Sequence, residues 1–161
     1  MKNFLFFFII ISIFSLTIIY SQNKDEKEKV EAAAAQYLNS AANESNIPSN
    51  IISSESLDKA KADILSMALK YDSTGKTNSM MLLPANKIKS MTPAEIWDYM
   101  ENISSTMEKS KMDIKWNIVN TEIKNDLAIV TYDVKGRKQK ILYLRKENNN
   151  WKVILSFASI F

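Results

Sequence analysis

The spacing of apolar residues along the chain changes once, near residue 110. From 25 to 109 they recur every three or four positions, which is the period of an amphipathic helix. From 112 to 161 they alternate with polar residues or form short blocks, as they do in strands. Helices followed by strands predict an α+β fold with an antiparallel sheet.

The first part of the chain predicts three helices, over 25–43, over 55–71 and from 93 onward. The third has the clearest start, because Thr92, Pro93 and Glu95 stand where a capping box requires them. Its apolar face is expected to comprise Ile96, Met100, Ile103 and Met107. Ser54 is the expected N-cap of the second helix.

Four strands are expected after the helices, over 112–120, 127–134, 138–145 and 151–161. The segments between them are short and rich in Asn, Asp and Gly, so neighbours in sequence should pair as an antiparallel meander. We expect the three helices to pack on one face of this sheet. The residues expected in the core are Trp116, Val130, Tyr132, Leu142, Leu144, Trp151, Val153 and Leu155.

The N-terminus has the pattern of a secretory signal peptide. Lys2 precedes 17 uncharged, mostly apolar residues from Phe4 to Tyr20, and a charged run begins at Lys24. The apolar run falls short of the roughly 20 residues that span a bilayer comfortably. We therefore expect a signal peptide over 1–21, cleavage after Ser21, and one domain over 22–161 in the periplasm or secreted. The alternative is an uncleaved anchor, which would be the chain's one contact with a membrane.

Composition excludes several kinds of chemistry. The chain has no Cys and no His, so disulfides, Cys- or His-based zinc sites and nucleophile systems that use either residue are excluded. Only two Gly occur, so Ser73–Thr77 lacks the rest of a phosphate loop. The net charge is +3, with acids interleaved among the bases, which argues against a nucleic-acid partner. We expect no cofactor and no metal.

Aromatic residues are the candidates for a binding site. An apolar pocket at the open end of the sheet would be lined by Trp97, Trp116, Tyr132, Tyr143 and Phe157. The alternative is that these are ordinary core residues. Strand alternation does not place all of these residues on the same face. Tyr132 shares the expected core face, whereas Tyr143 is out of phase with Leu142 and Leu144.

Asp133 is the candidate for a catalytic carboxylate. It is the one acid inside the apolar strand over 127–134, and a carboxylate in an apolar pocket can act as a general base. If Ala128, Val130, Tyr132 and Val134 form the core face, however, Asp133 points outward. This parity favours a noncatalytic side chain.

The layout resembles the nuclear-transport-factor-2-like superfamily, also called cystatin-like α+β. The resemblance rests on the last strand, Glu147 to Val153 with its Trp-Lys-Val, and on Asn125 to Val130, and it covers roughly 28–158. It implies a curved, cone-shaped sheet wrapped around the helices, with a pocket at the wide end. Isomerases and cyclases of this superfamily use Asp or His in that pocket. Leu155 and Phe157 stand where such relatives often carry polar groups, which argues against catalysis.

Three functions are consistent with these patterns. The first is an exported, noncatalytic bacterial domain that binds an apolar small molecule or a protein partner. The second is an isomerase- or cyclase-like enzyme with a buried carboxylate. The third is an envelope inhibitor or immunity-type protein that works through its exposed sheet. A homodimer through the sheet is a further expectation. The volume of the pocket distinguishes the first function from the third. If side chains fill the interior of the cone, only the outer surfaces of the protein can bind a partner.

Overall fold

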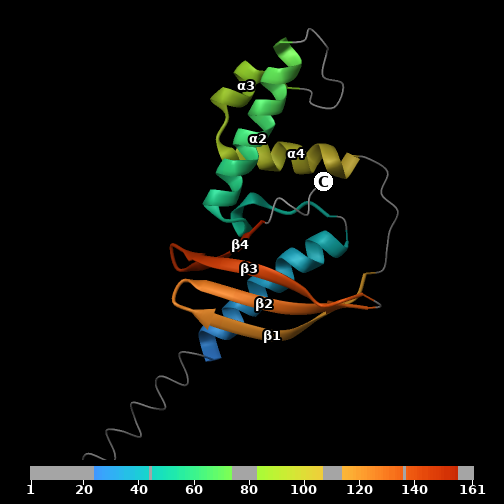
Figure 1. Ribbon diagram of the computed structural model, residues 1–161, viewed down its shortest axis with the longest axis vertical. Coiled ribbons are helices and arrows are strands. Elements are labelled where there is room, and N and C mark those ends of the chain that lie inside the picture. The colour runs from blue at the N-terminus through green and yellow to red at the C-terminus, as the bar shows by residue number, and fades with distance from the viewer. Residues whose placement is uncertain (1–23, 44, 74–82, 107–113, 136, 156–161) are drawn as a thin grey trace, which may run out of the picture.

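The fold is α+β, as predicted. The computed structural model describes residues 24–43, 45–73, 83–106, 114–135 and 137–155. Helices come first: residues 24–42, the 3-10 turn η1 (Ser49–Ile51), α2 (Ser54–Ser73), α3 (Ala85–Ser90) and α4 (Pro93–Thr106). The strands β1 (Trp116–Lys124), β2 (Leu127–Val134), β3 (Lys140–Glu147) and β4 (Asn150–Ile154) follow in one antiparallel sheet of order β1-β2-β3-β4 (Figure 1).

Two tight turns fix the ends of the strands. Asn148 and Asn149 both have positive φ, and they join Glu147 to its partner Asn150 as a two-residue hairpin loop. Asn125, also at positive φ, begins the equally short loop between Lys124 and Leu127. The bounds expected for β2 are confirmed. The other expected bounds are corrected. β1 begins at Trp116 and continues past 120 to Lys124 beyond a bulge at Val119. β3 begins and ends two residues later than expected, and β4 begins at Asn150 and ends at Ile154.

The main core lies between helix 24–42 and the inner face of the sheet. Val30 and Ala34 of the helix are fully buried against residues such as Val130, Leu144 and Val153. Of the eight expected core residues, six are buried: Val130, Leu142, Leu144, Trp151, Val153 and Leu155. Trp116 and Tyr132 are only half-buried. They lie at the end of the sheet where β1 begins and β2 ends, since Trp116 is opposite Val134.

The remaining helices pack mainly on one another. Ala68 of α2, Ala85 and Ile88 of α3, and Ile96 of α4 form a second buried cluster, above the sheet in Figure 1. The expectation that three helices pack on one face of the sheet is wrong, because only helix 24–42 lies along it. α2 and α4 reach the main core only near their first turns, through Leu57 and Trp97, and the short helix α3 was not expected. The chain passes the sheet at its β4 edge, where Ile52 makes a parallel bridge with Val153, and α2 then leads away from it.

The start of α2 is joined to this edge by two buried serines. The Ser53 backbone N–H donates to the Val153 carbonyl at 2.8 Å, and the Ser56 hydroxyl accepts from the Leu155 N–H at 2.9 Å. The Ser53 hydroxyl accepts from the Ser56 N–H, which makes Ser53 the N-cap. The expected cap, Ser54, is instead the first helical residue.

Several predictions lie outside the described residues. They are the signal peptide over 1–21, Met107 on the face of the third helix, the strand residues 112–113 and 156–161, and with these the pocket residue Phe157. In the part of the chain that is described, no helix combines the length and apolar character needed to cross a membrane.

Candidate functional site

The aromatic residues expected to line one pocket lie in different places. Trp97 donates its indole N–H to the Ile47 carbonyl at 2.7 Å and packs on the main core, so its contacts are structural. Tyr132 also packs on that core, and burial raises the pKa of its hydroxyl. Tyr143 lies on the opposite face of the sheet and is 47% exposed. Trp116 lies at the start of β1, opposite Val134.

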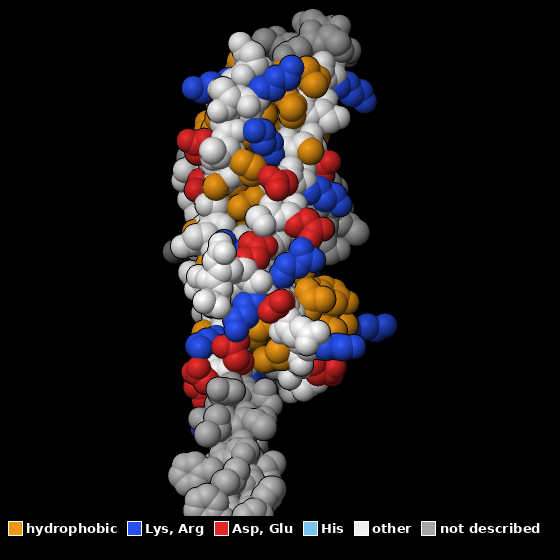
Figure 2. All heavy atoms as spheres, turned by 90° about the vertical axis from the view of Figure 1, so that its left-hand side faces the viewer, with side chains coloured by type: hydrophobic (Ala, Val, Ile, Leu, Met, Phe, Trp, Pro, Cys, Tyr) orange, Lys and Arg blue, Asp and Glu red, His pale blue; other side chains and the backbone are white. Residues whose placement is uncertain are grey.

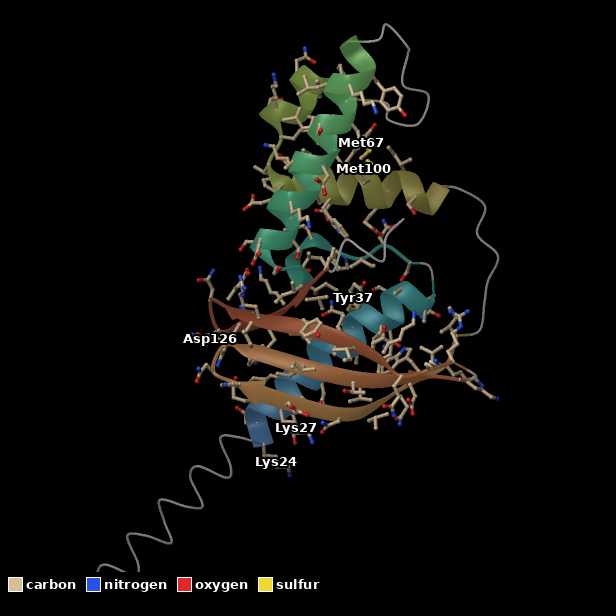
Figure 3. The ribbon with its side chains drawn as sticks, viewed as in Figure 1. Lys24, Lys27, Tyr37, Met67, Met100 and Asp126 are labelled. Atoms are coloured by element: carbon tan, nitrogen blue, oxygen red, sulfur yellow. The ribbon has the colours of Figure 1, made fainter. Side chains whose placement is uncertain are left out.

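The inner face of the sheet is filled by helix 24–42. Tyr37 belongs to this helix, burial raises the pKa of its hydroxyl, and its neighbours Ala34 and Leu38 are buried. Figure 3 shows Tyr37 on the helix behind the strands, with Lys24 and Lys27 at its start and Asp126 at the β1–β2 turn. Where a cone would hold a ligand, the described residues pack side chain against side chain.

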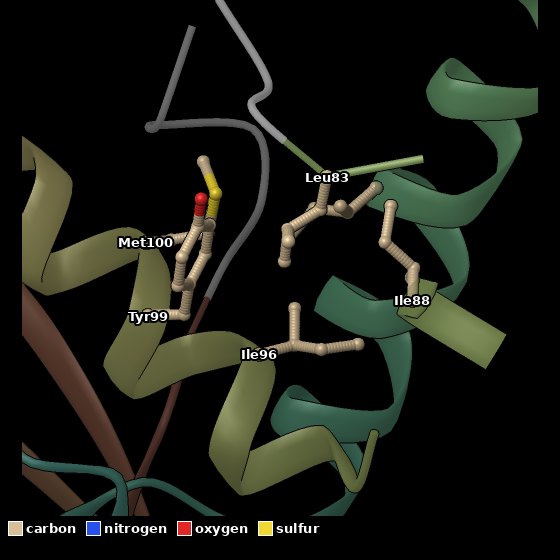
Figure 4. A pocket seen from close by; sticks show the side chains of 6 residues that line it. Leu83, Ile88, Ile96, Tyr99 and Met100 are labelled. Carbon is tan, nitrogen blue, oxygen red and sulfur yellow. The ribbon is translucent and has the colours of Figure 1, made fainter. Parts of the chain in front are cut away.

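An apolar cavity does occur between the upper helices, but it is small. It lies among Ile64, Leu83, Ile88, Ile96, Tyr99 and Met100 (Figure 4). Its volume is about 10 Å³, which is close to the space that one water molecule needs. Drug-sized ligands need about 300–1,000 Å³. This cavity is therefore a packing gap and not a ligand site.

The outer face of the sheet carries the most exposed apolar surface of the strands. Leu127 and Ile129 of β2, and Ile141 and Tyr143 of β3, are each between 38% and 54% exposed. Register makes them neighbours, since Ile129 lies opposite Tyr143 and one row from Ile141 and Leu127. Figure 2 shows hydrophobic side chains protruding together at the right of the lower, sheet-bearing part of the molecule, with Lys and Arg beside them. We call these four residues the outer patch.

A basic row borders the outer patch at the hairpin end. Lys124, Leu127, Arg145 and Lys152 lie opposite one another across the four strands. Arg145 forms an ion pair with Glu55, and Lys152 lies 3.9 Å from Glu147. Glu147 in turn accepts from the backbone N–H of Ser54 at the start of α2. Arg145 and Lys152 are thus linked to the first turn of that helix.

Asp133 lies at the other end of the outer face, as its strand parity predicts. It is opposite Asn117 and on the side of β2 that also carries Leu127, Ile129 and Thr131. The core side is formed by Ala128, Val130, Tyr132 and Val134. Asp133 lines neither the small cavity between the upper helices nor the groove between helix 24–42 and the β3–β4 hairpin. This placement gives it no apolar enclosure in which to act as a base.

A polar cluster joins the first turn of helix 24–42 to the inner edge of the sheet. The Glu26 carboxylate accepts from the Lys146 ammonium at 2.7 Å and from the Trp151 indole N–H at 3.1 Å. The Lys146 bond is the main reason why the pKa of Glu26 falls to about 2. Lys146 also lies 5.9 Å from the centre of the Trp151 ring. These contacts hold the Trp151 side chain in the core, so its role is in packing.

Of the outer patch, only Tyr143 was expected at a site, although an exposed working face of the sheet was among the expected functions. The signal for the patch was present, because Leu127 to Val130 and Ile141 to Leu144 are apolar at both parities of their strands. A sheet with one covered face needs apolar residues only at the alternate positions that face the core. The apolar residues at the remaining positions therefore indicated a second apolar face.

Comparisons with known proteins bring no further assignment. No family model, no curated protein and no solved structure matches this chain. Among the described residues, no group of three or more acidic side chains is arranged to hold a metal ion.

Proposed function

We propose that this chain is an exported, noncatalytic binding domain that holds a protein partner in the cell envelope through its outer patch. The observation that carries the proposal is the exposure of Leu127, Ile129, Ile141 and Tyr143 as neighbours on one sheet face. Scattered exposed apolar residues are normal, whereas contiguous ones rimmed by polar groups are typical of interaction sites.

The filled interior favours a protein partner over an apolar small molecule. The inner face of the sheet is covered by helix 24–42, and the apolar cavity between the upper helices has a volume of only about 10 Å³. Lys124, which lies opposite Leu127, adds a positive charge beside the patch, whereas Arg145 and Lys152 already face Glu55 and Glu147. The fitting partner presents an apolar surface with an acidic side chain at the edge that meets Lys124.

The catalytic alternative has less support. A general base needs a position from which it reaches a bound substrate. Asp133 lies on the outer face at the end of β2, away from both the small cavity and the main core. An inhibitor or immunity-type role agrees with the same outer surface and is included in the proposal.

Membership of the nuclear-transport-factor-2-like superfamily and export by a signal peptide are parts of this proposal. The support for the first is helix 24–42, which packs on the inner face of an antiparallel meander. The support for the second is the uncharged segment from Phe4 to Tyr20. If export and cleavage occur, the mature protein purified from the host should begin at Gln22 or within a few residues of it.

Site-specific photocrosslinking in the native cell envelope tests the proposal. A photoreactive phenylalanine analogue at Tyr143 should give a discrete crosslinked protein, and Ile129→Lys should abolish it, because the added charge cannot be buried in the contact. The same analogue at Asp58, on the exposed side of α2, is the matched control and should give no such product. The identified partner, once purified, should bind the Ile129→Lys variant at least tenfold more weakly.

Two results would contradict this function. Equal crosslinking from Tyr143 and Asp58 would mean that the outer patch has no specific occupant. A product of twice the chain's own mass, with no other partner, would mean that the patch is a homodimer interface. Sedimentation of the purified chain, with and without Ile129→Lys, separates these two cases.

A further inference from the structure

A groove on another side of the molecule has the size of a ligand site. It lies between helix 24–42, η1 and the β3–β4 hairpin, and its volume is about 640 Å³. This lies within the roughly 300–1,000 Å³ of small-molecule sites. Ala32 and Ala33 make room for it, because a larger side chain at either position would project into the space. None of the outer-patch residues lines it.

The walls of the groove are rich in carboxamides. Gln36 comes from the helix, Asn50 from η1, and Asn149 and Asn150 from the hairpin. Each carboxamide offers two N–H donors and one carbonyl acceptor. Asn149 is held by its positive φ in the turn, so its side chain starts from a fixed backbone. These four residues come from three separate elements, and one N–H of the Asn150 carboxamide already donates to the Asn148 carbonyl at 3.1 Å.

The groove presents little net charge. No acidic residue lines it, and its two lysines already have partners. The Lys29 ammonium lies 2.7 Å from Asp25, and Lys152, at the β4 edge, lies 3.9 Å from Glu147. A ligand held here would consequently be recognised by hydrogen bonds and not by its charge.

The aromatic floor of the groove gives no stacking surface. Trp151 lines the groove but is only 6% exposed, and its indole N–H is already bonded to Glu26. Sites for sugars commonly rely on an accessible aromatic face, which is missing here. A peptide main chain needs only donors and acceptors, and the four carboxamides supply both.

We propose that this groove binds a short stretch of extended, uncharged polypeptide through its main-chain amides. Carboxamides can donate to the peptide carbonyls and accept from the peptide N–H groups, as sheet edges do for added strands. The small floor of Ala32 and Ala33 admits a backbone with short side chains. This site is separate from the outer patch, so it does not rest on the function proposed above.

NMR titration of the full mature chain with a blocked peptide tests the proposal. The probe is acetyl-Ser-Ala-Ser-Ala-amide, which has no charge. It should shift the side-chain amide signals of Gln36, Asn149 and Asn150, with a Kd on the order of 1 mM or tighter. The same peptide with its main-chain amides N-methylated should bind at least tenfold more weakly, because its side chains are unchanged but its donors are lost.

Matched variants locate the binding. Gln36→Ala and Asn149→Gly should each weaken it at least threefold, and Gly keeps the turn because it accepts positive φ. Asn39→Ala lies one turn further along the same helix, on an exposed position outside the groove, and should leave binding unchanged. Ile129→Lys on the outer patch should also leave it unchanged.

Three outcomes would overturn the proposal. One is the absence of shifts at about 10 mM peptide, well above the expected Kd. A second is equal binding of the N-methylated peptide. A third is tighter binding of an uncharged trisaccharide or of an acidic peptide, either of which would assign the groove to a different class of ligand.

Discussion

Glu26 shows how a single side chain joins two parts of the fold. Its carboxylate receives hydrogen bonds from Lys146 and Trp151 on the hairpin, while Lys29 lies 3.3 Å away on its own helix. The charged form is favoured by all three contacts, so the pKa of Glu26 falls to about 2. A group whose pKa is lower in the folded state stabilises the fold only while it is ionised.

Replacing Glu26 should change how stability depends on pH. Glu26→Gln should lower the free energy of unfolding by roughly 1 kcal/mol at pH 7, a modest figure because the site is partly open to water. The contribution is complete above the unfolded pKa near 4.5 and disappears as pH falls towards 2, so the two proteins should converge at low pH. Urea unfolding at pH 7, 4 and 2.5 measures this difference.

Glu28→Gln is the control, since Glu28 is exposed on the same helix. It should leave the pH profile unchanged. Parallel profiles for Glu26→Gln and the unaltered protein down to pH 2.5 would contradict the assigned role of Glu26.

At the scale of elements, α4 starts as its sequence predicts. The Thr92 hydroxyl accepts from the Glu95 N–H at 3.2 Å, and the Glu95 carboxylate accepts from the Thr92 N–H at 2.6 Å. The backbone bond from Thr92 is the main cause that lowers the pKa of Glu95. Pro93 occupies the first helical position. The expected capping box is confirmed.

Removing the cap should destabilise the protein measurably. Thr92→Ala should cost about 1 kcal/mol, because the Glu95 N–H loses its acceptor, the Thr92 hydroxyl. Glu95→Gln should cost much less, since Gln serves the same position in a capping box. Thermal unfolding of the two variants checks this order, and a larger loss from Glu95→Gln would show that charge, and not hydrogen bonding, holds the turn.

The whole molecule contains two buried clusters of unequal size. The larger lies between helix 24–42 and the sheet, and the smaller joins α2, α3 and α4. They meet at the first turns of α2 and α4, through Leu57 and Trp97. Regions with separate clusters often open separately in hydrogen exchange.

Ile96→Ala tests whether the smaller cluster opens by itself. Ile96 is 1% exposed, so the substitution should cost about 2–5 kcal/mol within its cluster. Hydrogen exchange should then rise in α2 and α4 while amides of β2 and β3 stay protected. Val130→Ala in the main core is the comparison and should raise exchange everywhere. Equal loss of protection from both variants would mean that the clusters unfold as one unit.

Local features of this protein were readable from the sequence. The order of helices and strands, the bounds of β2, the capping box at Thr92 and the outward parity of Asp133 all agree with the structure. Each depends on residues close together in the chain: a repeat period, a cap three residues away, or an Asn at positive φ. Such features do not depend on contacts between residues that are distant in the sequence.

Tertiary structure decided which faces are covered. The parallel bridge between Ile52 and Val153 joins residues about a hundred positions apart, and it directs α2 away from the sheet. Only helix 24–42 remains on the inner face, so the aromatic residues expected in one pocket are distributed over two faces and several elements. The outer patch and the groove beside Ala33 are likewise left uncovered because α2 leads away from the sheet. Period and parity determine which side of an element is apolar, but only packing between distant elements determines what lies against it.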